Sequence, residues 1–259
     1  SHAHQPFVYA GYTIFVAEVP STLSEALFLD FMLERSTDER ERIVLLQHAI
    51  DGIVATFYTQ VMFADYELQA HKLAEEGKPV TAEVLSNIYF DLFQAYHGDA
   101  IDYDNESRLT WSRIPHFYST PFYVYQYATC FASSAALMKQ MRSGSQAERE
   151  SARDRYLTLL KSGSSDHPMA LLAKAGVDLS KPETVEAIVS QLDQLVSELE
   201  RVILASPGQQ PPSVRHSATN SGPAARWIAP STPPPPRSVV LAAFTIASTA
   251  SSVMSACTI

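Results

Sequence analysis

The sequence predicts an all-α protein, and three observations support this prediction. Helix-capping residues recur along residues 1–206, and the apolar side chains between them repeat at intervals of three and four residues. No alternation of apolar and polar residues typical of a β-strand extends beyond a few positions. The chain has 259 residues, of which 46% are apolar, so it can bury a substantial core. We therefore expect one large helical domain over residues 1–206.

Two capping patterns mark the first helices. The run Thr22–Glu25 has the spacing of a capping box, in which the Thr hydroxyl accepts from a backbone amide and the Glu reaches back, so a helix is predicted to begin there. The run Ser36–Glu39 offers a second box, and the apolar positions after it predict one long helix that ends at Glu76. Gly77 and Pro79 stop this helix, because glycine favours the turn after a helix and proline cannot continue it.

Three further helices are predicted in the rest of this domain. One begins at Thr81 and ends at His97, before a glycine. A second covers the aromatic stretch 122–141, with Pro121 in its first turn, where a missing amide costs nothing. The third begins in the run Ser180–Glu183, which combines a cap, an early proline and a glutamate at the box position. Its apolar stripe consists of Val185, Ile188, Leu192, Leu195, Leu199 and Ile203.

The composition changes sharply after residue 206. Nine of the 16 prolines lie between Pro207 and Pro236, and because proline fixes φ and lacks an amide donor, we interpret residues 207–237 as a disordered linker. Residues 238–259 form an apolar tail whose last 21 residues carry no charge. That length allows a membrane span, but seven of the 21 residues are Ser or Thr, so we favour an unstructured extension.

Charge and cysteine content argue against several classes of protein. Lys and Arg number 19 against 28 Asp and Glu, and the net charge of −9 indicates no nucleic-acid binding, which needs clustered basic residues. Two cysteines are too few for a disulfide scaffold or a Cys-rich metal site. The first residues lack the basic and then apolar pattern of a signal peptide, so a cytoplasmic location is the default expectation.

The first of two chemically suggestive segments surrounds Glu18. This glutamate is the single charged residue between Phe7 and Leu23, in a stretch where a carboxylate is costly unless it is paired, hydrogen-bonded or bound to a metal. The alternative interpretation is a glutamate in the N-terminal turn of a helix or in a salt bridge.

The second segment contains one histidine and a group of tyrosines. His116 is followed by Tyr118, Tyr123, Tyr125 and Tyr127. Imidazole and phenol groups can donate hydrogen bonds to an oxyanion without acting as nucleophiles. The alternative interpretation is an aromatic core helix with one hydrogen-bonded histidine.

A weaker candidate is the pair Glu67 and His71. The two residues are four positions apart, so on a helix they would share one face and could contact one metal ion. A metal site within a helical bundle needs further carboxylates from facing helices. We therefore interpret the pair as part of a solvated helix face.

Four separated blocks resemble the oligoendopeptidase F group of zinc peptidases, within the M3 or thimet oligopeptidase clan. They are the segment around Glu18, the run Met62–Glu67, the run Ile114–Ala128 (Ile-Pro-His-Phe-Tyr … Phe-Tyr-Val-Tyr-Gln-Tyr-Ala) and the run Ala175–Leu179. The resemblance covers roughly residues 1–204 and does not include the tail. It implies the C-terminal helical portion of an M3-type catalytic domain.

The resemblance implies a zinc-dependent endopeptidase of oligopeptides and assigns roles to individual residues. In the family, a His-Glu-x-x-His helix supplies two zinc ligands and the general base, and a downstream glutamate, which Glu18 matches, supplies the third ligand. The resemblance assigns His116, Tyr123 and Tyr125 to catalysis, and Tyr118 and Tyr127 to substrate binding. Which tyrosine contacts the tetrahedral intermediate stays open.

The sequence departs from the family pattern in one respect: the 259 residues contain no His-Glu-x-x-His motif. We interpret the chain as the C-terminal part of a catalytic domain whose metal helix lies upstream. Oligopeptides and the missing N-terminal part of the same enzyme are then the expected partners, and one Zn²⁺ is expected in the complete enzyme. The chain alone is expected neither to retain zinc, which needs three protein ligands, nor to cleave peptides.

The alternative function is that of a non-catalytic helical interaction or scaffold protein derived from such a peptidase. The proline-rich stretch could then be a ligand for an aromatic groove. The absent metal motif favours this alternative, whereas Glu18, His116 and the tyrosines favour an enzyme.

Overall fold

The structure, a computed structural model, describes residues 1–98 and 101–205, and within these ranges it contains helices and no strand. The predicted all-α class is confirmed. The helical elements in chain order are η1 (Phe7–Tyr9), α1 (Ile14–Ala17), α2 (Val19–Arg35), α3 (Glu39–Ile53), η2 (Val54–Tyr58), α4 (Thr59–Glu75), α5 (Ala82–His97), η4 (Ser107–Arg113), α6 (His116–Ser119), α7 (Tyr125–Arg142), α8 (Gln146–Ser162), α9 (Pro168–Lys174) and α10 (Pro182–Ala205). The expected linker at 207–237 and tail at 238–259 lie outside the described residues.

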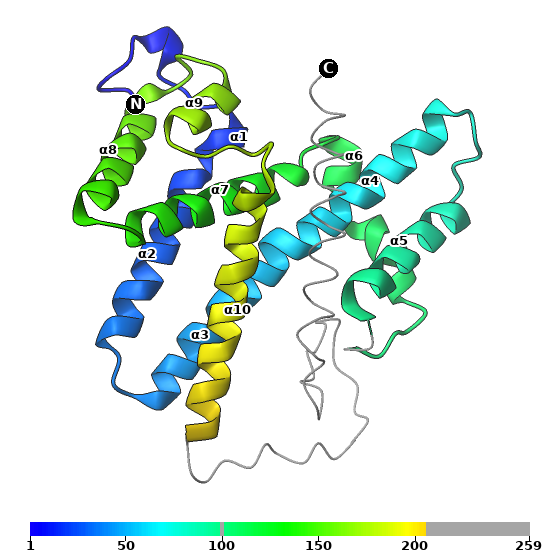
Figure 1. Cartoon of the computed structure of the whole chain (residues 1–259). Helices are drawn as coiled ribbons and strands as arrows, with labels where there is room; N and C mark the ends of the chain where they lie inside the picture. Colours follow the sequence, from blue (N-terminus) through cyan, green and yellow to red (C-terminus); the bar gives the residue numbers. More distant parts are fainter. Residues whose placement is uncertain (99–100, 206–259) are drawn as a thin grey trace.

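Helix α7 is the centre of the larger part of the fold. It contacts α1, α2, α4, α8 and α10, while α10 also lies along α3 (Figure 1). The buried face of α7 is lined by small side chains, and these let neighbouring helices approach closely. They are Ala128, Ala132, Ser133, Ser134, Ala135 and Ala136.

A second apolar cluster lies where α4 extends away from α7 towards α5 (Figure 1). Met62, Phe63 and Tyr66 of α4 contact Tyr89 and Leu92 of α5 in this cluster. The ring centroids of Tyr66 and Tyr89 are 5.7 Å apart, with nearly perpendicular planes. Edge-to-face aromatic pairs of this kind stabilise a core beyond the area that they bury.

The long predicted helix that ends at Glu76 is confirmed, with one local irregularity. Elements α3, η2 and α4 follow one another without a break, and η2 is a single turn of π-helix. The box predicted at Ser36 is wrong in detail, because Ser36 ends α2 as its C-cap. The N-cap of α3 is Asp38, whose carboxylate accepts from the amide of Arg40 at 2.8 Å. After α4 the chain turns at Gly77, where φ is +66°.

Two more predicted helix starts are confirmed. Thr81 caps α5, since its hydroxyl accepts from the Val84 amide at 3.3 Å. Helix α10 begins at Pro182, and Ile188 and Leu192 of its apolar stripe are buried. The apolar stripe becomes exposed to solvent towards the end of α10, where Ile203 is 45% exposed.

The start predicted at Thr22 is wrong, because α2 already begins at Val19. Pro20 lies in the first turn of α2, where proline removes no intrahelical bond, so the helix extends upstream of the apparent box. The Thr22 hydroxyl instead donates to the carbonyl of Glu18 at 2.9 Å, one turn back.

The placement of Pro121 within a helix is also wrong. Helix α7 begins at Tyr125, and Pro121 lies in a turn between α6 and α7. Phe122, the next residue, has φ of +58°, which no residue inside an α-helix adopts. Because of this backbone geometry, the helix predicted over 122–141 begins only at Tyr125, after the turn.

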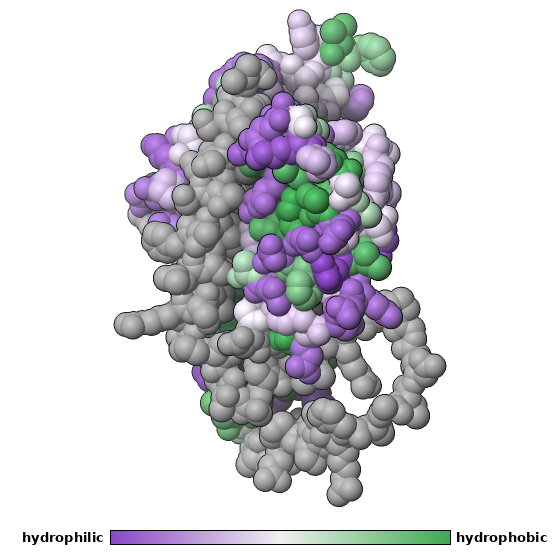
Figure 2. All heavy atoms as spheres, turned by 90° about the vertical axis from the view of Figure 1, so that its right-hand side faces the viewer, coloured by the Kyte–Doolittle hydropathy of each residue, from purple (hydrophilic) through white to green (hydrophobic). Residues whose placement is uncertain are grey.

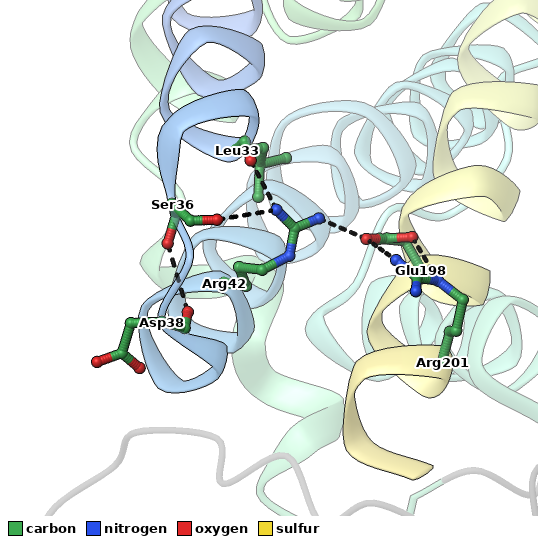
Figure 3. A network of polar contacts seen from close by, with 6 residues as sticks. All are labelled: Leu33, Ser36, Asp38, Arg42, Glu198 and Arg201. Atoms are coloured by element: carbon green, nitrogen blue, oxygen red, sulfur yellow. Dashed lines mark hydrogen bonds and ion pairs between the residues drawn. The ribbon is translucent and has the colours of Figure 1, made fainter. Parts of the chain in front are cut away.

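A polar network joins the end of α2, the start of α3 and the second half of α10 (Figure 3). Arg42 donates to the carbonyl of Leu33 at 2.6 Å and forms an ion pair with Glu198 at 2.5 Å. Arg201 also donates to Glu198, at 2.6 Å. Hydrogen bonds from Arg201 and from Arg42 hold the pKa of Glu198 below its usual range.

Several large apolar side chains stay exposed on the described part of the chain. Phe7 is 94% exposed and Phe28 of α2 is 63% exposed. Figure 2 shows an apolar area bordered by hydrophilic side chains on the face that includes α5. No helix among residues 1–98 and 101–205 is both long and apolar enough to cross a membrane.

Candidate functional site

Glu18 lies at the junction of α1 and α2. It closes α1 as its C-terminal cap and immediately precedes α2, and its exposed carboxylate accepts from the Ser21 hydroxyl at 2.8 Å. Helix α1 is held against α7 by Cys130, whose thiol donates to the carbonyl of Phe15 at 3.2 Å. Burial raises the pKa of Cys130 to about 12, so this thiol is a structural group and no nucleophile. These contacts place Glu18 beside the first turns of α7.

His116 is the first residue of α6 and is half-buried. Its ring is stacked on that of Tyr123, with centroids 4.8 Å apart and planes inclined by 27°. The Tyr127 ring lies 6.2 Å from it. The Nδ1 atom is 3.2 Å from the hydroxyl of Thr120, a contact that orients the imidazole.

Tyr123 and Tyr127 form a pair on the approach to α7 and in its first turn. Their ring centroids are 5.4 Å apart and their planes are nearly perpendicular. Burial, the hydrogen bond with Tyr123 and the negative charge of Glu18 all raise the pKa of Tyr127. Tyr127 therefore keeps its proton and stays a hydrogen-bond donor.

The ring contacts bring together His116, Tyr123 and Tyr127, and the negative charge of Glu18 acts on Tyr127. We call these four residues the His116 cluster. Its members come from the α1–α2 junction, from α6, from the turn after α6 and from α7. The cluster combines one carboxylate with an imidazole and two phenols on a partly open surface. Such an arrangement can bind a cation through the carboxylate and donate hydrogen bonds to a developing negative charge.

The structure places the other two predicted tyrosines elsewhere. Tyr118 is 61% exposed, and its ring lies 6.5 Å from that of Trp111. Tyr125 points towards α1, with its ring 6.3 Å from that of Phe15. The roles predicted for both residues, and for the members of the His116 cluster, stay predictions.

Glu67 is the residue that the sequence interpretation misplaced. It is 4% exposed and lies inside the second apolar cluster, so the solvated face predicted for Glu67 and His71 is wrong for Glu67. Helix α4 is covered by α5 and α7, and its residues Val61–Ala64 are all buried. The uninterrupted apolar run Val61–Ala64, one turn before Glu67, is the signal in the sequence that could have indicated burial of this part of the helix.

The carboxylate of Glu67 has one defined partner, the backbone amide of Phe122, which donates to Oε1 at 2.7 Å. Burial raises the pKa of Glu67, against smaller opposing effects of the Phe122 amide, His71 and His116. The His71 ring lies 4.5 Å from the Phe122 ring. Glu67 and His71 thus both contact the turn that leads to Tyr123.

A zinc ion does not fit the described residues by themselves. Catalytic zinc takes three protein ligands, usually His, Cys, Asp or Glu. Among residues 1–98 and 101–205 no three such side chains are arranged so that they could hold a metal ion. Glu18 therefore offers at most one ligand.

One open hollow, of about 490 Å³, lies away from the His116 cluster, over α8 and α9. Its lining includes both acidic and basic side chains and contains no group of the candidate site. Its lining is Ala147, Glu150, Ser151, Asp154, Arg155, Thr158 and Lys174.

Comparison with known proteins identifies similar sequences and structures. A model of the family "Peptidase family M3" matches residues 1–190. Oligopeptidase PepF of Bacillus subtilis is 44% identical over 201 residues, which are 78% of this chain and 29% of that protein. The plasmid-encoded oligoendopeptidase F of Lactococcus lactis is 37% identical over 200 residues, which are 77% of this chain and 32% of that protein.

The crystal structure of oligoendopeptidase F from Enterococcus faecium is similar in fold, with a TM-score of 0.69 and 38% sequence identity. The match covers 75% of this chain and 36% of that one. The chain thus spans about a third of the length of these relatives.

Proposed function

The chain belongs to peptidase family M3, and from this premise we propose that it forms part of the catalytic region of a zinc-dependent oligoendopeptidase. The observation that carries the proposal is the His116 cluster, which gathers Glu18, His116, Tyr123 and Tyr127 from separate segments onto one surface. The relatives are named as oligopeptidases and oligoendopeptidases, which supports short peptides as substrates.

The donors of the cluster suit the chemistry of peptide hydrolysis. Attack on the scissile carbonyl places a negative charge on its oxygen, and hydrogen bonds aimed at that oxygen stabilise the transition state. Tyr127 is a protonated phenol whose pKa is raised further by burial, and Tyr123 and the His116 imidazole lie beside it. In the proposed mechanism these groups hold the oxygen of the tetrahedral intermediate.

Glu18 is proposed as one carboxylate ligand of the metal. Among the described residues no three side chains could hold a metal ion, so the remaining ligands would come from outside them. Within this chain, the hydrogen bond from Ser21 restricts the orientation of the Glu18 carboxylate. A cytoplasmic location stays a prediction.

A second candidate is a non-catalytic helical interaction protein. It is favoured by one observation, the absence of a His-Glu-x-x-His motif from the 259 residues. The exposed apolar side chains of Phe7 and Phe28 would then belong to a binding surface.

The experiment that separates the two candidates uses the protein purified after expression from its own gene. Mass spectrometry of the intact protein and of its N-terminal peptide identifies the native chain. The protein is then incubated with internally quenched oligopeptides and, separately, with a folded protein. We expect cleavage of the peptides alone, loss of cleavage with 1,10-phenanthroline and recovery with added zinc.

The variant Glu18→Gln and its matched control Glu25→Gln test the proposed role of Glu18 as a metal ligand. Glu25 is an exposed carboxylate on the next turns of α2 and has no part in the cluster. We expect Glu18→Gln to lower both zinc content and kcat, and Glu25→Gln to leave both unchanged. A zinc-loaded wild-type protein that cleaves no peptide would contradict the enzyme proposal and favour the interaction protein. Equal zinc content and equal activity in the two variants would contradict the role of Glu18 as a metal ligand.

A further inference from the structure

The backbone of Phe122 has an uncommon conformation. Among the described residues it is the single non-glycine residue with positive φ, at +58°. L-residues avoid this region because the Cβ approaches the backbone too closely, and they remain in it when surrounding contacts hold them there. We therefore expect contacts around Phe122 that hold its backbone in this conformation.

Two side chains of α4 supply those contacts. Glu67 accepts the Phe122 amide at 2.7 Å, and the His71 ring lies against the Phe122 ring at 4.5 Å. Glu67 and His71 are one helical turn apart and so reach the turn from the same side of α4. The backbone and the side chain of Phe122 are thus both held by one rigid helix.

The turn at Phe122 determines where Tyr123 lies. The Tyr123 amide donates to the carbonyl of Thr120 at 3.2 Å, which closes the turn, and the Tyr123 ring then stacks on His116 at 4.8 Å. Helix α7 begins two residues later, and it brings Tyr127 to the same place. A different conformation at Phe122 would move Tyr123 away from His116.

We propose that Glu67 is a positioning residue, whose carboxylate oxygen holds the Phe122 turn so that Tyr123 and Tyr127 lie beside His116. As a statement about catalysis, this proposal rests on the proposed peptidase function. Burial supports it, because a carboxylate that is 4% exposed costs stability in an apolar cluster unless it satisfies a partner that an apolar side chain would leave unpaired. The Phe122 turn thus requires a hydrogen-bond acceptor at the distance from α4 that the Glu67 side chain spans.

Three variants separate the acceptor from the charge and from the side-chain length. Glu67→Gln keeps the reach and one acceptor oxygen but removes the charge. Glu67→Asp keeps the charge but is one methylene too short, and Glu67→Ala loses both. Ser86→Ala is the matched control, because it breaks the 3.0 Å bond from the Trp111 indole within the same apolar cluster and leaves the Phe122 turn untouched.

The first measurement is made by NMR on the 259-residue chain and needs no peptidase activity. We expect hydrogen exchange at the Phe122 amide to be at least tenfold faster in Glu67→Ala and Glu67→Asp than in the wild type. The ring-current shift of the His116 imidazole protons should move towards that of Tyr123→Leu, which lacks the stacked ring. Glu67→Gln and Ser86→Ala should retain both wild-type signals.

The second measurement is the activity of the same variants in the protein expressed from its own gene. We expect Glu67→Ala and Glu67→Asp to lower kcat at least tenfold with little change in KM, and Glu67→Gln to recover kcat to within about threefold. A purely structural role would lower the melting temperature without this selective recovery. If Glu67→Ala fails to fold, the Gln and Asp variants still decide, since both keep a polar side chain.

The outcomes separate the two proposals. Unchanged Phe122 exchange and His116 shifts in the Asp and Ala variants would overturn the positioning role, as would a Gln variant that behaves like Ala. A wild-type protein without peptidase activity would overturn the proposed function instead, and the NMR result alone would then decide whether Glu67 positions the tyrosine pair.

Discussion

Gly163 and Tyr9 are in direct backbone contact, although η1 and α8 are far apart in the sequence. A Cβ atom added at Gly163 would lie 2.0 Å from the carbonyl oxygen of Tyr9. Gly163 has φ of +54° and ψ of −134°, a region that glycine adopts readily and other residues rarely adopt. The next residue, Ser164, donates its amide to the same Tyr9 oxygen at 2.9 Å. This contact holds the segment before α1, and with it the approach to Glu18, against the end of α8.

We expect Gly163→Ala to lower the free energy of unfolding by at least about 2 kcal/mol, because the new methyl group meets backbone atoms that cannot rotate away. Gly52→Ala is the control, since Gly52 lies within α3 and a Cβ there meets nothing within 4 Å. It should stabilise the chain by about 0.5 to 1 kcal/mol. Urea denaturation of the three proteins measures both effects, and equal effects of the two substitutions would contradict the contact.

The ion pair of Arg42 with Glu198 should contribute measurably to stability. Both side chains are about three-quarters buried, and Arg42 also donates to the carbonyl of Leu33. We expect Arg42→Met to cost about 1 to 2 kcal/mol in chemical denaturation, since it removes charged hydrogen bonds that join α3 to α2 and α10. Arg153→Met, which removes an exposed pair with Asp154, should cost less than about 0.5 kcal/mol.

The same network predicts a pH dependence. The pKa of Glu198 is lowered by Arg201 and Arg42, so the native state binds this proton less readily than the unfolded state. The stabilising contribution is therefore present above the unfolded pKa and is lost as the pH falls through the folded pKa. The difference in stability between wild type and Glu198→Gln should shrink between pH 6 and pH 3, and a constant difference would contradict this prediction.

The contribution of Glu67 to stability should depend on pH in the opposite direction. Burial raises its pKa in the native state, so its contribution to stability is present below the unfolded pKa and is lost as the pH rises through the folded pKa. Glu67→Gln removes the ionisation, so its stability relative to the wild type should increase from acidic to neutral pH. Urea denaturation at several pH values checks the direction, and a relative stability that decreases with pH would show that the carboxylate is paired more strongly than its contacts indicate.

The tyrosines near His116 should differ in their contribution to peptide cleavage. We expect Tyr123→Phe to lower kcat about 100-fold, because it removes a donor beside His116. Tyr118→Phe should act mainly on KM, since Tyr118 is exposed and lies away from the cluster. Tyr9→Phe, a conservative change at a half-exposed residue of η1, is the control and should leave both constants unchanged. Steady-state kinetics with one internally quenched peptide measures kcat and KM of the three variants. Equal effects of Tyr123→Phe and Tyr118→Phe on kcat would contradict this prediction.

Much of the fold could be predicted because the signals are local. Thr81 and Pro182 mark helix starts through their own side-chain or backbone chemistry, and the structure confirms these starts. The run Ser36–Glu39 indicated the start of α3, although the cap is Asp38 and not Ser36. The capping pattern at Thr22 failed for a local reason as well, since Pro20 permits an earlier start. The family, too, was predictable, because its blocks are contiguous runs of residues, and the comparison confirms it.

The sequence by itself determined the helical class, the family and the residue types available for chemistry. Only the tertiary structure decided which of them meet. Phe122 leaves the helical region because α4 holds its amide and its ring, so Tyr123 reaches His116 whereas Tyr125 turns towards Phe15. The burial of Glu67 likewise depends on α5 and α7 covering α4. The burial of a residue depends on contacts with segments that are distant in the chain. A local sequence pattern therefore does not predict it.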